Sequence, residues 1–149
     1  MTGTKLEVLE SDQMRYGEWK KKFPQGQVLS RDTGAVRFYG SNPYGDYFAP
    51  TDFAVSIAKS RDTRLPNDAF VFGVVINGKA KAYLVEAVKV KGEVEDTFEG
   101  VTIILRHEKE ADVTRMYKKT SDGGLLRINP FSAFWFSWAA VHPQTELYK

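Results

Sequence analysis

Residues 32–35 read Asp-Thr-Gly-Ala, the triplet that carries the catalytic carboxylate in aspartic proteases. In those enzymes two such aspartates meet across a two-fold axis and share one proton, so one copy per chain would require a homodimer. The triplet should also follow a buried apolar strand, whereas Ser30 and Arg31 precede it here. Because Asp, Thr and Gly are also typical turn residues, we interpret the segment as a turn and keep catalysis by Asp32 as the alternative.

The loop around this triplet, residues 31–53, is rich in Gly, Asp, Asn, Pro and Tyr. A long loop inside a compact domain is usually functional or disordered, and its many aromatic residues argue against disorder. Ring faces and hydrogen-bonding groups within one short span are typical of small-molecule and glycan sites. The alternative is that the tyrosines pack the loop onto the sheet while Arg37 pairs with Asp32 or Asp46. The candidate ligand-binding residues in 31–47 are Asp32, Arg37, Tyr39, Asn42, Tyr44 and Tyr47.

The sequence offers few other groups that could hold a metal or attack a substrate. It has no cysteine and two histidines. His107-Glu108 begins like a zinc-binding HExxH helix, but Ala111 stands where the second histidine is required. His142 precedes a proline at an expected helix end, where an imidazole can interact with free carbonyl groups. We therefore expect no metal site and no cofactor, and a fold that forms without a transition metal.

Composition favours one globular domain, residues 1–149, with 42% hydrophobic and 27% charged residues. The net charge of +2 is too small for a general attraction to nucleic acid, and the longest apolar run is too short to span a bilayer. No apolar signal core follows Met1. We expect the chain as given to be cytoplasmic, or exported or in the cell envelope if a signal segment has been removed.

One pattern occurs twice in the chain. Segments 19–29 and 138–148 both read Trp, three residues, a ring, Pro-Gln, two residues, and then two large residues. Proline cannot continue a helix and pushes the preceding residue out of helical geometry, so each copy predicts a helix that stops and re-emerges as a short strand. The repeat suggests that the single domain consists of two related halves, in which Trp19 and Trp138 hold corresponding places.

The amino-terminal part predicts one surface helix between two short strands, 5–10 and 28–30. Ser11 or Asp12 offers the helix an N-cap. The rings of Tyr16, Trp19 and Phe23 fall at i, i+3 and i+7, which predicts an aromatic stripe that faces inward.

The remainder of the chain predicts an antiparallel meander. Asn77-Gly78 and Glu99-Gly100 separate alternating apolar runs, and such turns need positive φ at both central residues. A turn at 121–124 and an apolar final helix follow. We expect the helix to be enclosed within the chain, which makes a monomer the favoured state and a homo-oligomer the alternative. The expected elements are strands 70–76, 79–85, 93–98, 101–107 and 113–118 and a helix at 131–141. The predicted fold class is α+β, an antiparallel strand-rich meander or partly closed barrel packed with two short Trp-bearing helices.

The sequence contains the segments Trp19-x3-Phe23-Pro24, Val28 to Gly34, Arg37-x-Tyr39, Asn42-Pro43-Tyr44, Tyr47, Arg64-Leu65-Pro66, Gly73-Val74-x2-Asn77-Gly78-x-Ala80-x-Ala82-Tyr83 and Phe134-Trp135-Phe136-x-Trp138-Ala139-Ala140-x-His142-Pro143. In these segments the chain resembles an uncharacterised bacterial and archaeal family, domain of unknown function 3179. The resemblance covers nearly the whole chain. It implies that the chain is the carboxyl-terminal portion of a longer architecture, whose upstream half carries a Cys-Pro-Leu-Cys motif and often an export signal. It implies no activity.

The sequence favours a non-catalytic module that binds a small molecule or a protein through the Tyr-rich loop 31–47. The competing hypothesis is a hydrolase that uses Asp32 and Arg37 of the same loop. A third is a structural half that needs a partner. A closed cleft with perturbed carboxylates would favour the enzyme, whereas an open aromatic surface would favour binding.

Overall fold

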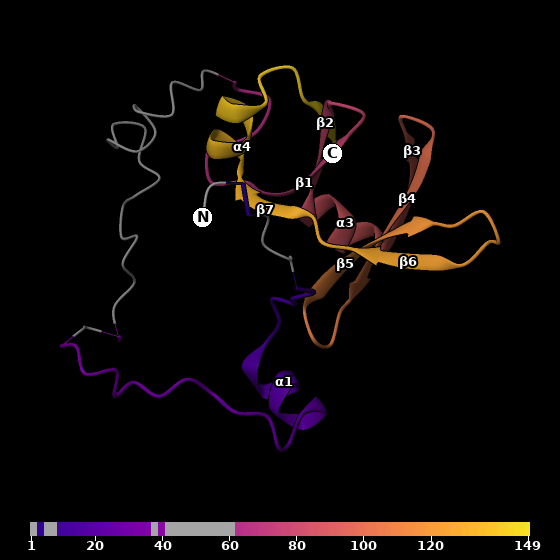
Figure 1. The fold of residues 1–149 in the computed structure, drawn as a ribbon. Coiled ribbons are helices and arrows are strands. Elements are labelled where there is room, and N and C mark those ends of the chain that lie inside the picture. The colour runs from indigo at the N-terminus through magenta and orange to yellow at the C-terminus, as the bar shows by residue number, and fades with distance from the viewer. Residues whose placement is uncertain (1–2, 5–8, 37–38, 41–61) are drawn as a thin grey trace.

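The computed structural model describes residues 3–4, 9–36, 39–40 and 62–149, and in these it contains three short helices and two four-stranded sheets (Figure 1). Sheet A has the order β7-β1-β2-β8 and sheet B the order β3-β4-β5-β6. All neighbours are antiparallel except β2 and β8, which are parallel. The sheets do not close into a barrel, so the chain is a strand-rich α+β fold. The elements are α1 (Tyr16–Lys22), β1 (Phe70–Ile76), β2 (Lys79–Leu84), α3 (Val85–Lys91), β3 (Glu93–Phe98), β4 (Val101–Glu108), β5 (Val113–Lys119), β6 (Leu125–Ile128), β7 (Phe131–Phe134), α4 (Trp135–Val141) and β8 (Glu146–Tyr148).

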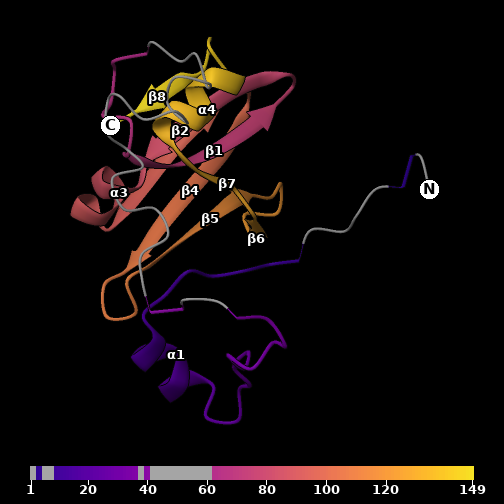
Figure 2. The same cartoon turned by 90° about the vertical axis from the view of Figure 1, so that its left-hand side faces the viewer.

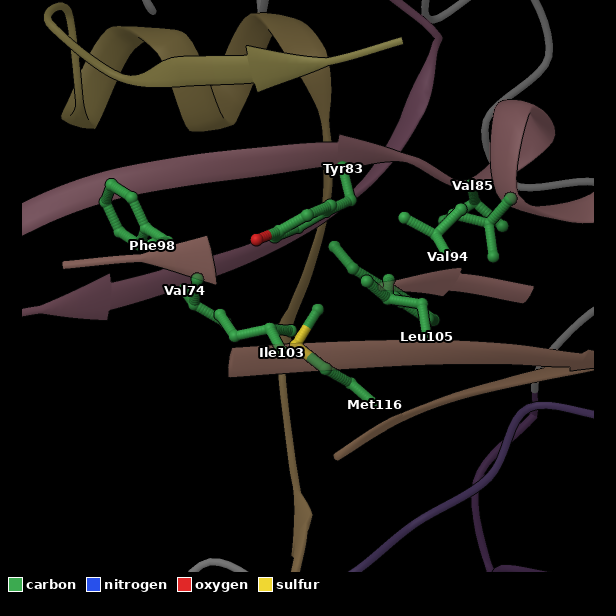
Figure 3. Packing of buried hydrophobic residues seen from close by; sticks show 10 residues of the cluster. Val74, Tyr83, Val85, Val94, Phe98, Ile103, Leu105 and Met116 are labelled. Atoms are coloured by element: carbon green, nitrogen blue, oxygen red, sulfur yellow. The ribbon is translucent and has the colours of Figure 1, made fainter. Parts of the chain in front are cut away.

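The main core lies between the two sheets (Figure 3). Tyr83 of β2 is fully buried here, and its hydroxyl donates to Asp96 Oδ2 at 2.8 Å. Burial and this hydrogen bond raise the pKa of Tyr83. The buried members are Phe72, Val74, Tyr83, Val85, Val88, Val94, Phe98, Ile103, Leu105 and Met116.

A second cluster covers the other face of sheet A. Successive residues of a strand point to opposite faces, so Phe72 and Val74 face the main core while Val71 joins Trp135 and Trp138 of α4. The chain therefore forms three layers, α4, sheet A and sheet B (Figure 2). The described helices include none long and apolar enough to cross a membrane.

Both predicted hairpins are confirmed. Asn77 and Gly78 have φ of 51° and 78°, and Glu99 and Gly100 have φ of 48° and 76°. These positive values are what a two-residue turn requires if its twist is to match the twist of the flanking strands. β5 and the turn at 121–124 also form where expected.

The repeated Trp-to-Pro-Gln pattern produces the same local geometry twice. Phe23 ends α1 with φ −126° and ψ 69°, and His142 ends α4 with φ −124° and ψ 69°. Each donates its backbone N–H to the tryptophan carbonyl four residues earlier, at 2.8 and 2.9 Å. The second copy continues into β8 as predicted, whereas 28–30 form no strand. The pattern therefore encodes a helix stop, and a relation between two halves stays a prediction.

Two expectations about α1 are wrong. Its N-cap is Arg15, because Asp12 binds arginines of sheet B instead. The aromatic stripe does not face inward, since α1 has no buried residue. Instead the rings contact one another: Tyr16 stacks on Trp19, with 5.8 Å between the ring centroids, and Phe23 is tilted against Trp19, with 6.3 Å between the centroids. The predicted strand 5–10 lies partly outside the described residues, and 9–10 form no strand.

The carboxyl-terminal helix is shorter than predicted. Residues 131–134 form β7, which pairs with β1 so that Phe134 lies opposite Phe70 and Phe131 opposite Gly73. Pairing with an otherwise open strand edge outweighs the helical spacing of the aromatic residues. The helix begins only at Trp135, and Trp135, Phe136 and Trp138 are buried within the chain.

Helix α3 was not predicted. Its sequence, VEAVKVK, contains three β-branched valines, which lower helix propensity. Val85 and Val88 nevertheless fall three apart on one buried face, and Gly92 ends the helix with φ 77°. Glycine adopts this left-handed conformation without steric cost, which makes it a common residue just after a helix.

Candidate functional site

The structure describes two of the six residues that the sequence singles out for binding. Asp32 and Tyr39 lie in the described part of loop 31–47, and Arg37, Asn42, Tyr44 and Tyr47 lie outside it. The ligand-binding role of the six residues therefore stays a prediction, as does an ion pair of Arg37 with Asp32 or Asp46.

The Asp-Thr-Gly triplet lies in a bend in the described part of the loop. The backbone N–H of Asp32 donates to Ser30 Oγ at 3.0 Å, and Gly34 has φ 73°. A hydroxyl that binds the backbone two residues on is a common local turn device. The hydroxyls of Thr33 and Tyr39 lie 2.8 Å apart, and Tyr39 is 47% exposed. The contact with Thr33 thus holds Tyr39 beside this bend, where the Tyr39 ring stays partly open to solvent.

A second candidate site lies beneath residues 9–15, which we call the arm. The arm has no regular secondary structure and leads into α1 (Figure 2). Two cavities, of about 240 and 220 Å³, lie between the arm and the sheets. Gln13, Phe72 and Thr114 line both of them. The two cavities therefore border the same stretch of β5.

Two arginines of sheet B hold the arm through Asp12. Arg115 of β5 donates from Nε and Nη2 to the carboxylate at 2.8–3.2 Å, and Arg127 of β6 donates from Nη2 to Oδ1 at 2.6 Å. The side chain of Arg115 is 15% exposed and that of Arg127 is 22% exposed. Burial of Asp12 opposes its ionisation, but the hydrogen bonds and charges of both arginines outweigh burial and lower its pKa. Arg115 and Arg127 are therefore arranged so that both bind one carboxylate.

A second carboxylate, Asp112, lies at the other end of the arm. Lys89 Nζ binds its Oδ1 at 2.7 Å, Arg15 Nη2 lies 3.8 Å from Oδ2, and His107 Nε2 lies 3.8 Å from Oδ1. The hydrogen bond from Lys89, helped by the charges of Arg15 and His107, lowers the pKa of Asp112. The other ring nitrogen of His107 lies 3.0 Å from Thr114 Oγ1. This cluster links the arm to α3 and β4.

Neither histidine lies in a metal-binding arrangement within the described residues. His107 and Glu108 belong to strand β4, so the resemblance of this segment to a zinc-binding helix does not extend to its structure. No group of three or more potential ligands comes together in the part of the chain that the structure describes. His142 ends α4, as predicted, and its ring lies 4.1 Å from that of Trp138.

Sequence reasoning missed the arginine pair. The sequence offers Ser11 or Asp12 as the N-cap of a helix and places Arg115 in the expected strand 113–118, but it predicts no element at Arg127. The strand register is the signal that would have indicated the pair. Tyr117 lies opposite Arg127, and Arg115 is two residues from Tyr117 on the same face of the sheet, so the two arginines are neighbours. The register of β5 and β6 depends on the turn at 121–124.

The family model described as Protein of unknown function (DUF3179) matches residues 1–145. The chain belongs to this family. The match confirms the resemblance drawn from the sequence motifs, and the DUF3179 description carries no activity. No curated protein and no solved structure matches the chain. The position of this chain within a longer DUF3179 architecture stays a prediction.

Proposed function

We propose that this DUF3179 chain is a non-catalytic binding module that recognises a small molecule or a protein through the aromatic surface of α1 and the Tyr-rich loop 31–47. The observation that carries the proposal is the uncovered aromatic stack of α1. Tyr16 is 59% exposed and Phe23 is 46% exposed, although both rings contact Trp19. Aromatic side chains supply large contact areas at low entropic cost and are enriched in binding surfaces.

The stack is held in place before any ligand arrives. A Cβ at Gly26 would lie 2.6 Å from the indole of Trp19, so the ring rests directly on the backbone of the turn that follows α1. The backbone N–H of Gly26 donates to the Phe23 carbonyl at 2.8 Å, which fixes that turn. A preorganised surface loses less conformational freedom on binding. This geometry supports the binding of a ligand to the exposed rings of Tyr16 and Phe23.

The carboxylates whose pKa is lowered among the described residues are not suited to act as general acids. A general acid needs a raised carboxyl pKa, whereas partners lower the pKa of Asp12, Asp62 and Asp112. For Asp62 the main cause is the hydrogen bond from Arg64, whose Nη2 lies 2.7 Å from Oδ2. These carboxylates act as ion-pair partners. The alternative function, a hydrolase that uses Asp32 and Arg37, rests on the loop sequence alone.

The proposal is tested by ligand-observed NMR with a library of saccharides and aromatic fragments. Compounds that bind the wild-type chain should lose binding in Trp19→Ala, Arg37→Ala and Tyr39→Ala, while the melting temperature changes little. Phe131→Ala is the matched control, because Phe131 is 65% exposed but lies on β7. Binding that survives all three loop and helix variants would overturn the proposal. Ester hydrolysis that Asp32→Asn abolishes would favour the hydrolase instead.

A further inference from the structure

Strand β5 has an open edge beside the arm. β6 pairs with β5 only from Met116 to Lys119, so the first part of β5, residues 113–115, extends beyond the end of β6. On its other side this part is paired with β4, with Thr114 opposite His107. Within the described residues no strand pairs with 113–115 on the β6 side. An open strand edge is a template for an added strand.

The arm lies along this edge without forming a strand on it (Figure 2). Its backbone contacts are few: Arg15 N–H donates to the Ala111 carbonyl at 3.0 Å, and side chains of Arg127 and Asn129 donate to arm carbonyls at 2.9 and 2.8 Å. Leu9 of the arm is 75% exposed. The two cavities remain between the arm and Thr114, so the arm fills the edge incompletely.

Charge, rather than apolar packing, holds the arm at this edge. Arg115 and Arg127 both bind the Asp12 carboxylate, Arg127 also lies 3.8 Å from Glu10, and Arg115 has a second partner in Glu108 at 2.9 Å. Two guanidinium groups on one carboxylate supply several charge-assisted hydrogen bonds, which are stronger than neutral ones. Without Asp12, Arg115 would keep only Glu108 and Arg127 only the more distant Glu10, so both arginines could accept another carboxylate.

We propose that the open edge of β5 and the Arg115–Arg127 pair form a binding site for an extended acidic peptide of a partner protein, and that the arm occupies this site in the free chain. The peptide adds to residues 113–115 as a strand and places a carboxylate where Asp12 lies. Main-chain hydrogen bonds supply affinity in this mode of recognition, and the arginine pair supplies the preference for an acidic residue. Asp12 thereby acts as an internal competitor. This site is separate from the aromatic surface of α1, so either proposal can fail alone.

The test uses a fluorescein-labelled, end-capped peptide with the sequence of residues 9–15, Leu-Glu-Ser-Asp-Gln-Met-Arg, titrated into the full chain and followed by fluorescence anisotropy. The Asp12→Asn chain should bind it at least about tenfold more tightly than the wild type, because the tethered arm competes at a high effective concentration. A peptide with Asn in place of its Asp should bind about tenfold more weakly, since it lacks the charge-assisted bonds.

The matched control distinguishes the arginine pair from general positive charge. Arg115→Gln in the Asp12→Asn background should abolish binding, whereas Arg106→Gln should not, although Arg106 lies directly opposite Arg115 on β4. Equal loss in both variants, or no binding to a folded Asp12→Asn chain, would overturn the proposal. A concentration-dependent dimer of the wild-type chain that Asp12→Asn abolishes would also overturn it, because a second copy would then be the occupant.

The wild-type chain gives a readout that does not depend on the variants folding. Saturating peptide should displace the arm and remove the hydrogen-exchange protection of the Arg15 amide, which donates to Ala111. The amide of Gly92, which donates to Val88 at the end of α3, should keep its protection. Saturation that leaves the Arg15 amide protected would contradict displacement of the arm.

Discussion

The indole of Trp138 lies directly on the backbone of Gly73. A Cβ at Gly73 would lie 2.3 Å from the indole atoms Cη2 and Cζ3, closer than any side chain tolerates. Trp138 is 4% exposed, and its Nε1 donates to Thr145 Oγ1 at 2.9 Å, so the ring cannot move aside without breaking this buried hydrogen bond. The missing side chain of Gly73 is therefore what allows α4 to pack on sheet A.

Gly73→Ala should lower the free energy of unfolding by about 1–3 kcal/mol, the usual cost of overpacking a core. Urea denaturation measures it. Gly17→Ala is the control, because a Cβ at Gly17 meets no atom within 4 Å and alanine favours the helix in which it lies, so the stability should not fall. Equal stability of Gly73→Ala and the wild type would show that α4 is not held against β1 in this way.

The two tryptophans of the repeated pattern, Trp19 and Trp138, should contribute differently to the free energy of unfolding. Trp138→Ala should cost about 3–5 kcal/mol, because it truncates a large buried side chain. Trp19→Ala should cost less than about 1 kcal/mol, because α1 buries no residue. Thermal and urea melts of both variants compare them. Similar losses would mean that the two copies have equivalent structural roles, and our assignment of Trp19 to a binding surface would be wrong.

The contribution of Asp12 to stability should depend on pH. Its pKa in the folded chain is lowered, so its ion pairs stabilise the fold above the ordinary carboxyl pKa of about 3.9 and are lost as pH falls through the lower folded value. Asp12→Asn should therefore cost about 1–2 kcal/mol at pH 7 and progressively less as the pH falls below about 3.9 toward pH 2. Urea melts at both values measure it. A difference that stays constant with pH would exclude the ion pairs as its source.

The sequence predicted the parts of the fold that short-range chemistry decides. Asn77-Gly78 and Glu99-Gly100 fix their turns through two adjacent residues, and Pro24 and Pro143 end helices wherever those helices lie. The error at residues 131–134 arose because the partner strand, β1, lies about sixty residues earlier in the sequence, and no local pattern reports that its edge is open. Long-range strand pairing overrode a helical spacing of aromatic residues.

The candidate site was harder to predict for the same reason. Arg115 and Arg127 come together through strand register, and Asp12 reaches them from more than a hundred residues away. The sequence correctly predicts that the rings of α1 lie on one side of the helix. Amphipathic spacing does not indicate, however, what that side of the helix packs against. Here Trp19 meets Gly26 and its neighbouring rings instead of a sheet.

A charged contact between Lys81 and Asp96 links the two sheets. Lys81 of β2 has an 11% exposed side chain, and its Nζ lies 2.7 Å from Asp96 on β3 and 3.4 Å from Glu146 on β8. Asp96 is the closer partner and also accepts the Tyr83 hydroxyl, so Asp96→Asn leaves a nearly buried ammonium without its main counter-charge. We expect a loss of about 1–3 kcal/mol. Glu146→Gln should cost less than about 0.5 kcal/mol, because the Glu146 side chain is 58% exposed. Urea melts of the two variants at pH 7 compare these losses, and an equal or larger loss in Glu146→Gln would mean that Lys81 is neutralised mainly within sheet A rather than across the two sheets.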